Sequence, residues 1–274
     1  MICLSRHEQS FLRAIGADLS RATLVENSSN YDGFEEAGPD AFRRKYGLDR
    51  YGLCVGRLEY RKNQALLAHA LRGHHLPLVL IGDYGDPGYG ELVRKYSQSN
   101  VIYIGPVNDR RLLASAYAGA DALILPSWAE GASLAALEAG FFGTPLILSM
   151  MSSEREYFGE LADYVHPADM AGIRDALDRV LQSPGSKERR SALAAFTRRR
   201  YGFVQHAENT LAVYLKAAAQ PASRPDEMSI GPLPPRGPYQ RAVARIFSEA
   251  RPGYKDYGIV RRTPRHPVSE RLAV

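Results

Sequence analysis

Short, uniformly apolar runs alternate with segments of helical spacing from residue 51 onward. The apolar runs are YGLCVG, LPLVLIG, VIYIG, ALIL and PLIL. Strands that are apolar along their whole length, rather than at every second position, are typical of a parallel sheet with helices on both faces. The pattern therefore predicts an α/β fold built on a Rossmann-like, doubly wound parallel sheet, with ligands bound beyond the carboxyl ends of the strands.

Helices are expected after the sheet, and an irregular tail follows them. The helices are predicted at 169–182, 187–200 and 203–219. Residues 220–274 hold nine of the seventeen prolines, with ten Lys and Arg against five Asp and Glu, so the whole net charge of +5 lies there. A solvated basic tail is the commoner explanation, and weak contact with an anionic membrane surface is the alternative. No nucleic-acid partner is expected.

The expected location of the protein in the cell follows from targeting signals that the sequence lacks. No run of eighteen apolar residues occurs, and the first residues have no cationic start followed by an apolar core. Neither a membrane span nor a secretory signal is therefore expected. Cys3 and Cys54 lie far apart, which indicates a reducing compartment rather than a disulfide scaffold. We expect a cytoplasmic protein, peripheral at the inner face of the membrane if the tail binds lipid.

One segment of the tail, residues 239–251, has a single apolar face. It could form a membrane-surface helix, a partner helix or a lid, and we expect a lid docked on the domain.

Cations follow the first apolar run. Gly56 and Arg57 come directly after this strand, and Lys62 is expected at the start of the next helix. A phosphate placed there would meet two cations and the positive end of a helix dipole. These side chains and Arg61 could also be ordinary solvated charges, but their position at the ligand-facing edge favours a phosphate site. Gly82, at the end of the second strand, would let the backbone approach a ligand closely.

Metal binding is not expected. Asp83 and Asp86 share one loop, but acids in a loop rich in Gly and Pro are more often turn formers. The seven histidines are scattered and form no pattern typical of metal ligands.

The stretch 121–148 has the pattern of a strand, a loop, a helix and a strand. The start of its helix would present unpaired backbone N–H groups to a ligand at the strand ends. These are the groups of Gly131, Ala132, Ser133 and Leu134. Glu130 in the loop and Glu138 in the helix carry carboxylates, which accept hydrogen bonds from sugar hydroxyls. Each glutamate alone is more often a helix-terminal or solvated residue, but Glu138 is the one charge in an apolar helix and needs a partner or a ligand.

These residues carry a family resemblance. Pro126-Ser127, Glu130-Gly131, Glu138-Ala139, Gly143 and Pro145 resemble, in this order, the Glu-x7-Glu signature of retaining glycosyltransferases of the GT-B fold. The nearest group is family four, the glycosyl transferases group 1, which use nucleotide-sugar donors. The resemblance covers roughly residues 5–219 and implies the C-terminal, donor-binding half of a GT-B fold.

The resemblance also implies roles. Arg57 and Lys62 match the pair that holds the donor diphosphate, and Glu130 completes the expected catalytic set. The expected donor-binding residues are Gly56, Gly82, Val107, Gly131, Ala132, Ser133, Leu134 and Glu138. Two fixed cations can neutralise the leaving diphosphate, so the resemblance implies transfer of a hexose without a metal or another cofactor. Polysaccharide biosynthesis is the expected context.

Three segments are expected along the chain. Residues 1–48 are interpreted as a remnant of the N-terminal domain with its linker, 49–219 as the nucleotide-sugar-binding domain, and 220–274 as the tail. Most of an acceptor domain is expected to be lacking, so a separate N-terminal domain or chain is an expected partner. Two alternatives to a glycosyltransferase remain: a non-catalytic nucleotide-sugar-binding module, and a sugar-nucleotide epimerase on the same fold.

Overall fold

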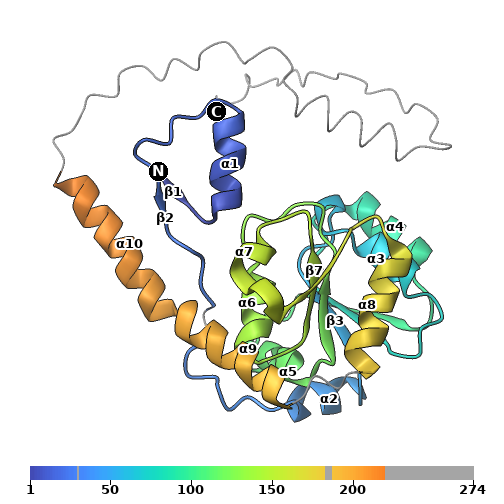
Figure 1. Cartoon of the computed structure of the whole chain (residues 1–274). Helices are drawn as coiled ribbons and strands as arrows, with labels where there is room; N and C mark the ends of the chain where they lie inside the picture. Colours follow the sequence, from blue (N-terminus) through green and yellow to red (C-terminus); the bar gives the residue numbers. More distant parts are fainter. Residues whose placement is uncertain (30, 183–186, 220–274) are drawn as a thin grey trace, which may run out of the picture. The chain divides into compact units, whose positions relative to one another are not determined.

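The computed structural model describes residues 1–29, 31–182 and 187–219 (Figure 1). Its main sheet has six parallel strands in the order β5-β4-β3-β6-β7-β8. The strands are β3 (Gly52–Val55), β4 (Leu78–Ile81), β5 (Val101–Gly105), β6 (Ala122–Leu125), β7 (Leu146–Ser149) and β8 (Asp163–Val165). The order runs outward on one side of β3 and then continues from β6 on the other side. The predicted doubly wound parallel sheet is therefore confirmed.

The sheet interior explains the uniformly apolar runs. Every residue of β4, β6 and β7 is buried. In the register of the central strands, Leu123 lies opposite Leu53 on one side and Leu146 on the other. Because helices cover both faces, neither face of a strand needs polar side chains.

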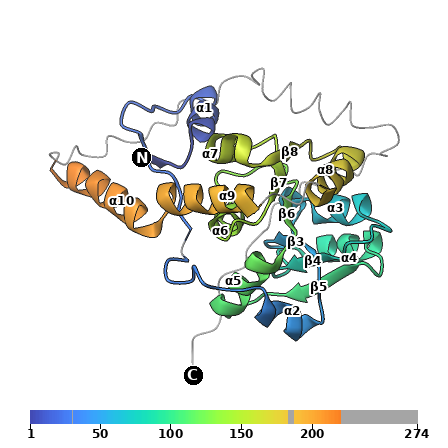
Figure 2. The same cartoon turned by 60° about the horizontal axis from the view of Figure 1, so that its bottom comes forward.

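Helices form a layer on each face of the sheet (Figure 2). The first layer has α3 (Gln64–Ala70), α4 (Pro87–Tyr96) and α8 (Met170–Gln182). The second layer has α2 (Asp40–Tyr46), α5 (Arg110–Gly119), α6 (Leu134–Phe141) and α9 (Lys187–Arg200). α7 (Glu154–Phe158) and the short 3-10 turn η2 (Gly159–Leu161) lie between β7 and β8, and α10 (Phe203–Ala218) follows α9. The three helices predicted after the sheet are thus present.

The N-terminal segment forms a small unit beside α7. β1 (Ile2–Cys3) and β2 (Thr23–Leu24) make a two-stranded parallel sheet, and α1 (Arg6–Ala14) lies between them in sequence. The Glu156 carboxylate of α7 accepts hydrogen bonds from the backbone N–H groups of Arg6 and His7 at the start of α1. A carboxylate at a helix N-terminus is favourable because it pairs with free N–H groups and the helix dipole.

Residues before β3 also contribute to the main core. Phe42 of α2 is fully buried against Tyr51, with a ring-centroid separation of 5.4 Å. Tyr31 is also buried, and its ring packs edge-on to Tyr117 of α5.

One predicted helix begins later than expected. The segment starting at Arg61 was expected to be helical, with Lys62 at its start, but α3 begins only at Gln64. Tyr60–Lys62 form a separate 3-10 turn, η1. Asn63 separates the two elements because it has φ 63° and ψ 26°, a left-handed conformation that cannot continue a helix. Lys62 therefore lies just before the helix, not in its first turn.

The helices of residues 1–29, 31–182 and 187–219 include none with the length and apolar character of a membrane span. The same ranges contain no cluster of three His, Cys, Asp or Glu side chains suited to a metal ion. The helix predicted at 239–251 lies outside the described residues.

Candidate functional site

The candidate site lies at the carboxyl edge of the sheet, where the strand order reverses. β3 and β6 are neighbours there, so the loop after β3 and the loop after β6 meet. Open α/β sheets commonly bind ligands at such a switch point. The loop after β4 closes in from the other side: a Cβ on Gly82, at φ +152°, would stand 2.0 Å from the carbonyl oxygen of Gly56. Only glycine permits this approach.

A continuous chain of ion pairs crosses this edge. The Arg57 guanidinium lies 3.5 Å from the Glu59 carboxylate, which Arg61 also contacts at 2.7 Å. Arg61 in turn contacts Glu130 at 2.8 Å, and the Lys62 ammonium contacts the same carboxylate at 2.7 Å. The structure thus brings Arg57, Lys62 and Glu130 into one network. Sequence reasoning had named Arg61 among the charges of this loop but had assigned roles only to Arg57 and Lys62.

The Glu130 carboxylate is the most buried member of the network. Its side chain is 6% exposed, compared with 13% for Lys62 and 42% for Arg61. Oε1 accepts from Lys62 and Oε2 from Arg61. Burial alone would lower the pKa of the Arg61 guanidinium, but Glu130 and Glu59 outweigh it and raise this pKa. A buried carboxylate needs such partners, because an uncompensated charge in the interior is costly.

Asn63 ties three loops together. Its Nδ2 donates to the carbonyl oxygen of Pro126, after β6, at 3.0 Å and to that of Pro167, after β8, at 2.8 Å. The residue can serve this way because asparagine tolerates the left-handed conformation better than most residues. Sequence reasoning missed Asn63, although an Asn between a charged loop and an apolar helix is a usable signal.

The expected N–H groups lie at the start of α6. The Ser133 hydroxyl accepts from Ala136 N at 3.3 Å and so caps the helix. A Cβ on Gly131 would meet no atom within 4 Å, so this backbone borders open space. Ser153 supports the loop from below, since its hydroxyl donates to the carbonyl oxygens of Glu130 and Gly131. The flanks differ: Ala132 is partly buried, whereas Leu134 is exposed.

Val107, in the loop after β5, packs partly buried against the core.

Glu138 lies in a neighbouring cluster. Its Oε2 accepts a hydrogen bond from the Tyr117 hydroxyl of α5 at 2.6 Å. Burial raises the pKa of this carboxyl, while the Tyr117 hydrogen bond and the charge of Arg110 act in the opposite direction. Among the described residues, no hydrogen bond or ion pair joins Glu138 to Arg57, Lys62 or Glu130. The charge in the apolar helix therefore has a protein partner, as the sequence required.

A further carboxyl group, Glu154, lies near the network. It is buried at the start of α7 and accepts a hydrogen bond from the Ser152 hydroxyl. Burial raises its pKa to about 7; Ser152 opposes this shift, the negative charge of Glu130 adds to it and Lys62 opposes it. The burial of Glu154 depends on contacts that the local sequence does not reveal.

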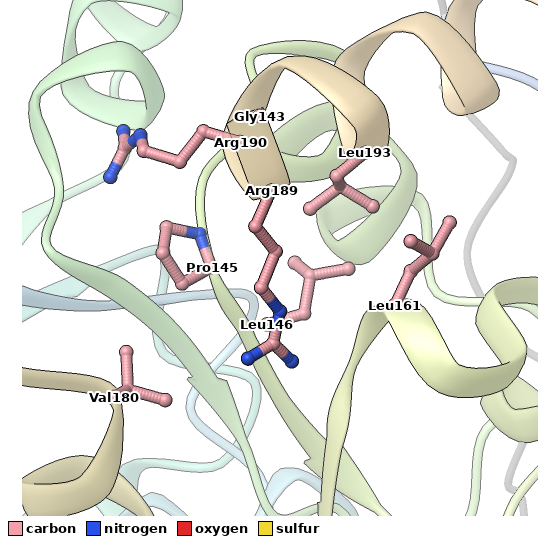
Figure 3. Close-up of a pocket in the computed structure, with 8 residues that line it drawn as sticks. All are labelled: Gly143, Pro145, Leu146, Leu161, Val180, Arg189, Arg190 and Leu193. Carbon is pink, nitrogen blue, oxygen red and sulfur yellow. The ribbon is translucent and has the colours of Figure 1, made fainter. Parts of the chain in front are cut away.

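The pocket in Figure 3 lies elsewhere, at the amino edge of the sheet. Gly143 and Pro145 precede β7, and Val180 is near the end of α8. The residues that line it are Gly143, Pro145, Leu146, Leu161, Val180, Arg189, Arg190 and Leu193. This lining is mostly apolar and contains no carboxylate, so the pocket is not the candidate site.

Comparisons with known proteins give a family. Residues 40–200 match the family described as glycosyl transferases group 1. A D-inositol 3-phosphate glycosyltransferase from Xylanimonas cellulosilytica is 31% identical over 248 residues, which cover 82% of this chain and 58% of that protein. A glycogen synthase from Mycobacterium tuberculosis is 30% identical over 203 residues, covering 70% and 47% of the two chains. This chain thus spans about half the length of the curated relatives that it matches.

Solved structures share the fold. A sucrose-phosphate synthase from Thermosynechococcus elongatus superimposes with a TM-score of 0.69 at 23% identity, covering 80% of this chain and 58% of that one. Anabaena Alr3699/HepE in complex with UDP-glucose gives 0.68 at 16% identity, covering 80% and 63%. The expected GT-B relationship is confirmed by these likenesses.

Proposed function

The chain belongs to the glycosyl transferases group 1 family, and we propose that it binds a nucleotide-diphosphate sugar at the carboxyl edge of its sheet for transfer of the sugar to an acceptor. The observation that carries the proposal is the network in which two cations share the nearly buried carboxylate of Glu130. Such a site offers a diphosphate positive charge and a sugar hydrogen-bond acceptors in one place.

The diphosphate, the sugar and the ribose of the donor would each have a matching group. The diphosphate would bind Arg57 and Lys62, and the sugar hydroxyls would donate to Glu130. The free N–H groups at the start of α6 support a sugar or phosphate oxygen, because unpaired donors gather at a helix N-terminus. Glu138 would accept from the ribose hydroxyls. Its bond to Tyr117 uses Oε2, and a carboxylate has further lone pairs for a ligand.

The proposed reaction is retaining hexose transfer. The bond between the anomeric carbon and the diphosphate breaks with its electron pair on the diphosphate oxygen, a bond to the acceptor oxygen forms, and the acceptor proton passes to the departing diphosphate. Arg57 and Lys62 would stabilise the charge that develops on the departing diphosphate, so we propose that no metal is needed. The cytoplasmic location and the membrane contact of residues 220–274 stay predictions.

Thermal unfolding with nucleotide sugars tests the proposal. Ligand at a hundredfold excess over its Kd adds ~2.7 kcal/mol to the free energy of unfolding. We expect UDP- or GDP-hexoses to raise the Tm of the chain and to raise that of Lys62→Ala much less at the same ligand concentration. If no common nucleotide sugar raises the Tm of the unchanged protein, the proposal is wrong. Product analysis then separates the remaining readings: a transferred hexose supports the enzyme, whereas binding without turnover indicates a binding module and an altered nucleotide sugar indicates an epimerase.

A further inference from the structure

We propose that Arg61 is a positioning residue: it keeps the Glu130 carboxylate compensated when Lys62 leaves that carboxylate to bind a diphosphate. This inference rests on the proposed function, because it assumes that Lys62 takes the diphosphate. No motif of the family resemblance includes Arg61, and the inference depends on the geometry around it.

The two cations bind different oxygens of the Glu130 carboxylate. Lys62 Nζ bonds Oε1 at 2.7 Å, and Arg61 Nη1 bonds Oε2 at 2.8 Å. Since the cations use different oxygens, departure of Lys62 breaks one hydrogen bond and leaves the other in place. The Glu130 carboxylate is then still held from one side, while Oε1 becomes available to a sugar hydroxyl.

Arg61 is held in place by further hydrogen bonds besides the one to Glu130. Its Nη1 also donates to the carbonyl oxygen of Ala129 at 2.8 Å, and its Nη2 donates to Glu59 at 2.7 Å. Its own carbonyl oxygen accepts from Trp128 N at 2.8 Å. Arg61 is therefore fixed to the loop after β6 through backbone and side chain. A planar guanidinium suits this task, because it can donate to several acceptors in a fixed geometry.

Without Arg61, Glu130 would keep a single ion-pair partner among the described residues, Lys62. A diphosphate that pulls Lys62 away would leave a carboxylate with a 6% exposed side chain uncompensated. Because such a charge is costly, Lys62 would be held back and the diphosphate would bind more weakly. Arg61 thus affects diphosphate affinity without touching the ligand.

Calorimetric titration of the full chain with UDP and with GDP tests the inference. These probes carry no sugar, so Glu130 is not required as a contact to the ligand. We expect Arg61→Ala to weaken the affinity of whichever nucleotide binds by about tenfold. Adding Glu130→Gln to Arg61→Ala should restore the affinity, since the amide no longer holds Lys62. Arg61→Lys should lose less than Arg61→Ala, because an ammonium can still reach one oxygen.

Arg50→Ala is the matched control. Arg50 also forms a 2.8 Å ion pair with an acid next to β6, Asp121, but at the amino edge of the sheet. This variant should bind nucleotide as the unchanged protein does. Affinity of Arg61→Ala equal to that of the unchanged protein, or a loss that Glu130→Gln does not restore, would overturn the role of Arg61. Absence of binding by the unchanged protein, or binding that Lys62→Ala does not weaken, would instead overturn the proposed function and with it this inference.

Discussion

At each end of the neighbouring strands β3 and β6, an arginine beside β3 pairs with an acid beside β6, but the two pairs are built differently. At the amino edge, Arg50 donates twice to one oxygen of Asp121, at 2.9 and 2.8 Å, and Tyr51 N donates to the other at 2.9 Å. The Asp121 side chain is thus bonded to the backbone just before the neighbouring strand β3. At the carboxyl edge, both oxygens of Glu130 are held by side-chain cations, Oε2 by Arg61 and Oε1 by Lys62. The first arrangement fixes structure, whereas the second leaves one partner, Lys62, that a ligand can exchange.

The largest expected difference between these edges is in ligand binding. Lys62→Ala removes a cation from the proposed diphosphate site, so we expect the Kd for UDP- or GDP-hexose to rise about a hundredfold, equivalent to ~2.7 kcal/mol. Arg50→Ala should leave the Kd unchanged. Calorimetric titration measures both. Equal Kd values for the two variants would remove the distinction between the edges.

A smaller effect is expected on the loops of the carboxyl edge. Asn63→Gly keeps the left-handed conformation but removes the hydrogen bonds to Pro126 O and Pro167 O. We expect a loss of about 2 kcal/mol in the free energy of unfolding, because two buried acceptors lose their donor. Chemical denaturation measures this loss. Asn63→Ala should lose more, since a Cβ with no local hydrogen bond disfavours this conformation; a smaller loss than for Asn63→Gly would contradict the account.

The pH dependence of stability should depend on Glu154. Its pKa is raised from 4.5 to about 7 in the folded chain, so between these values the folded state holds a proton that the unfolded state has lost. Stability therefore falls as pH rises through this window, by on the order of 1 kcal/mol between about pH 6 and 7. Glu154→Gln cannot titrate and should show a flatter profile in thermal unfolding. Identical profiles for variant and unchanged protein would show that Glu154 is not the titrating group.

The smallest effect is expected at the amino edge. The Arg50 side chain is 51% exposed, and exposed ion pairs contribute little. Arg50→Ala should lower the free energy of unfolding by about 0.5 kcal/mol, measured by chemical denaturation. A loss as large as that of Asn63→Gly would mean that the amino-edge pair contributes more than its exposure implies.

The fold could be predicted because its signals are local. Runs such as 122–125 and 146–148 are apolar throughout; Pro126 follows the first, and Gly143 and Pro145 precede the second. Their alternation with helical segments is enough to indicate a parallel sheet. By contrast, α2 was not predicted, because the burial of Phe42 depends on packing against α5, which is distant in sequence, as well as against Tyr51.

The site could be predicted only in part. Residues at strand ends, such as Lys62 and Glu130, follow from the topology, because parallel strands bring their carboxyl ends to one edge. The partners that define the site do not follow. The sequence around Arg61 does not reveal its contact with Glu130, because Glu130 lies 69 residues further along the chain. Tyr117 and Glu138 likewise meet only because α5 and α6 pack side by side.

The central claim, that the carboxyl edge binds a nucleotide diphosphate, has a direct reporter. Trp128 is the single tryptophan of the chain, lies two residues before Glu130 and donates a hydrogen bond from its backbone N–H to the carbonyl oxygen of Arg61. Titration with UDP and GDP, followed by tryptophan fluorescence, should give a saturable change that Lys62→Ala shifts to much higher nucleotide concentration. A signal that stays constant while calorimetry registers binding would place the nucleotide elsewhere and contradict the account.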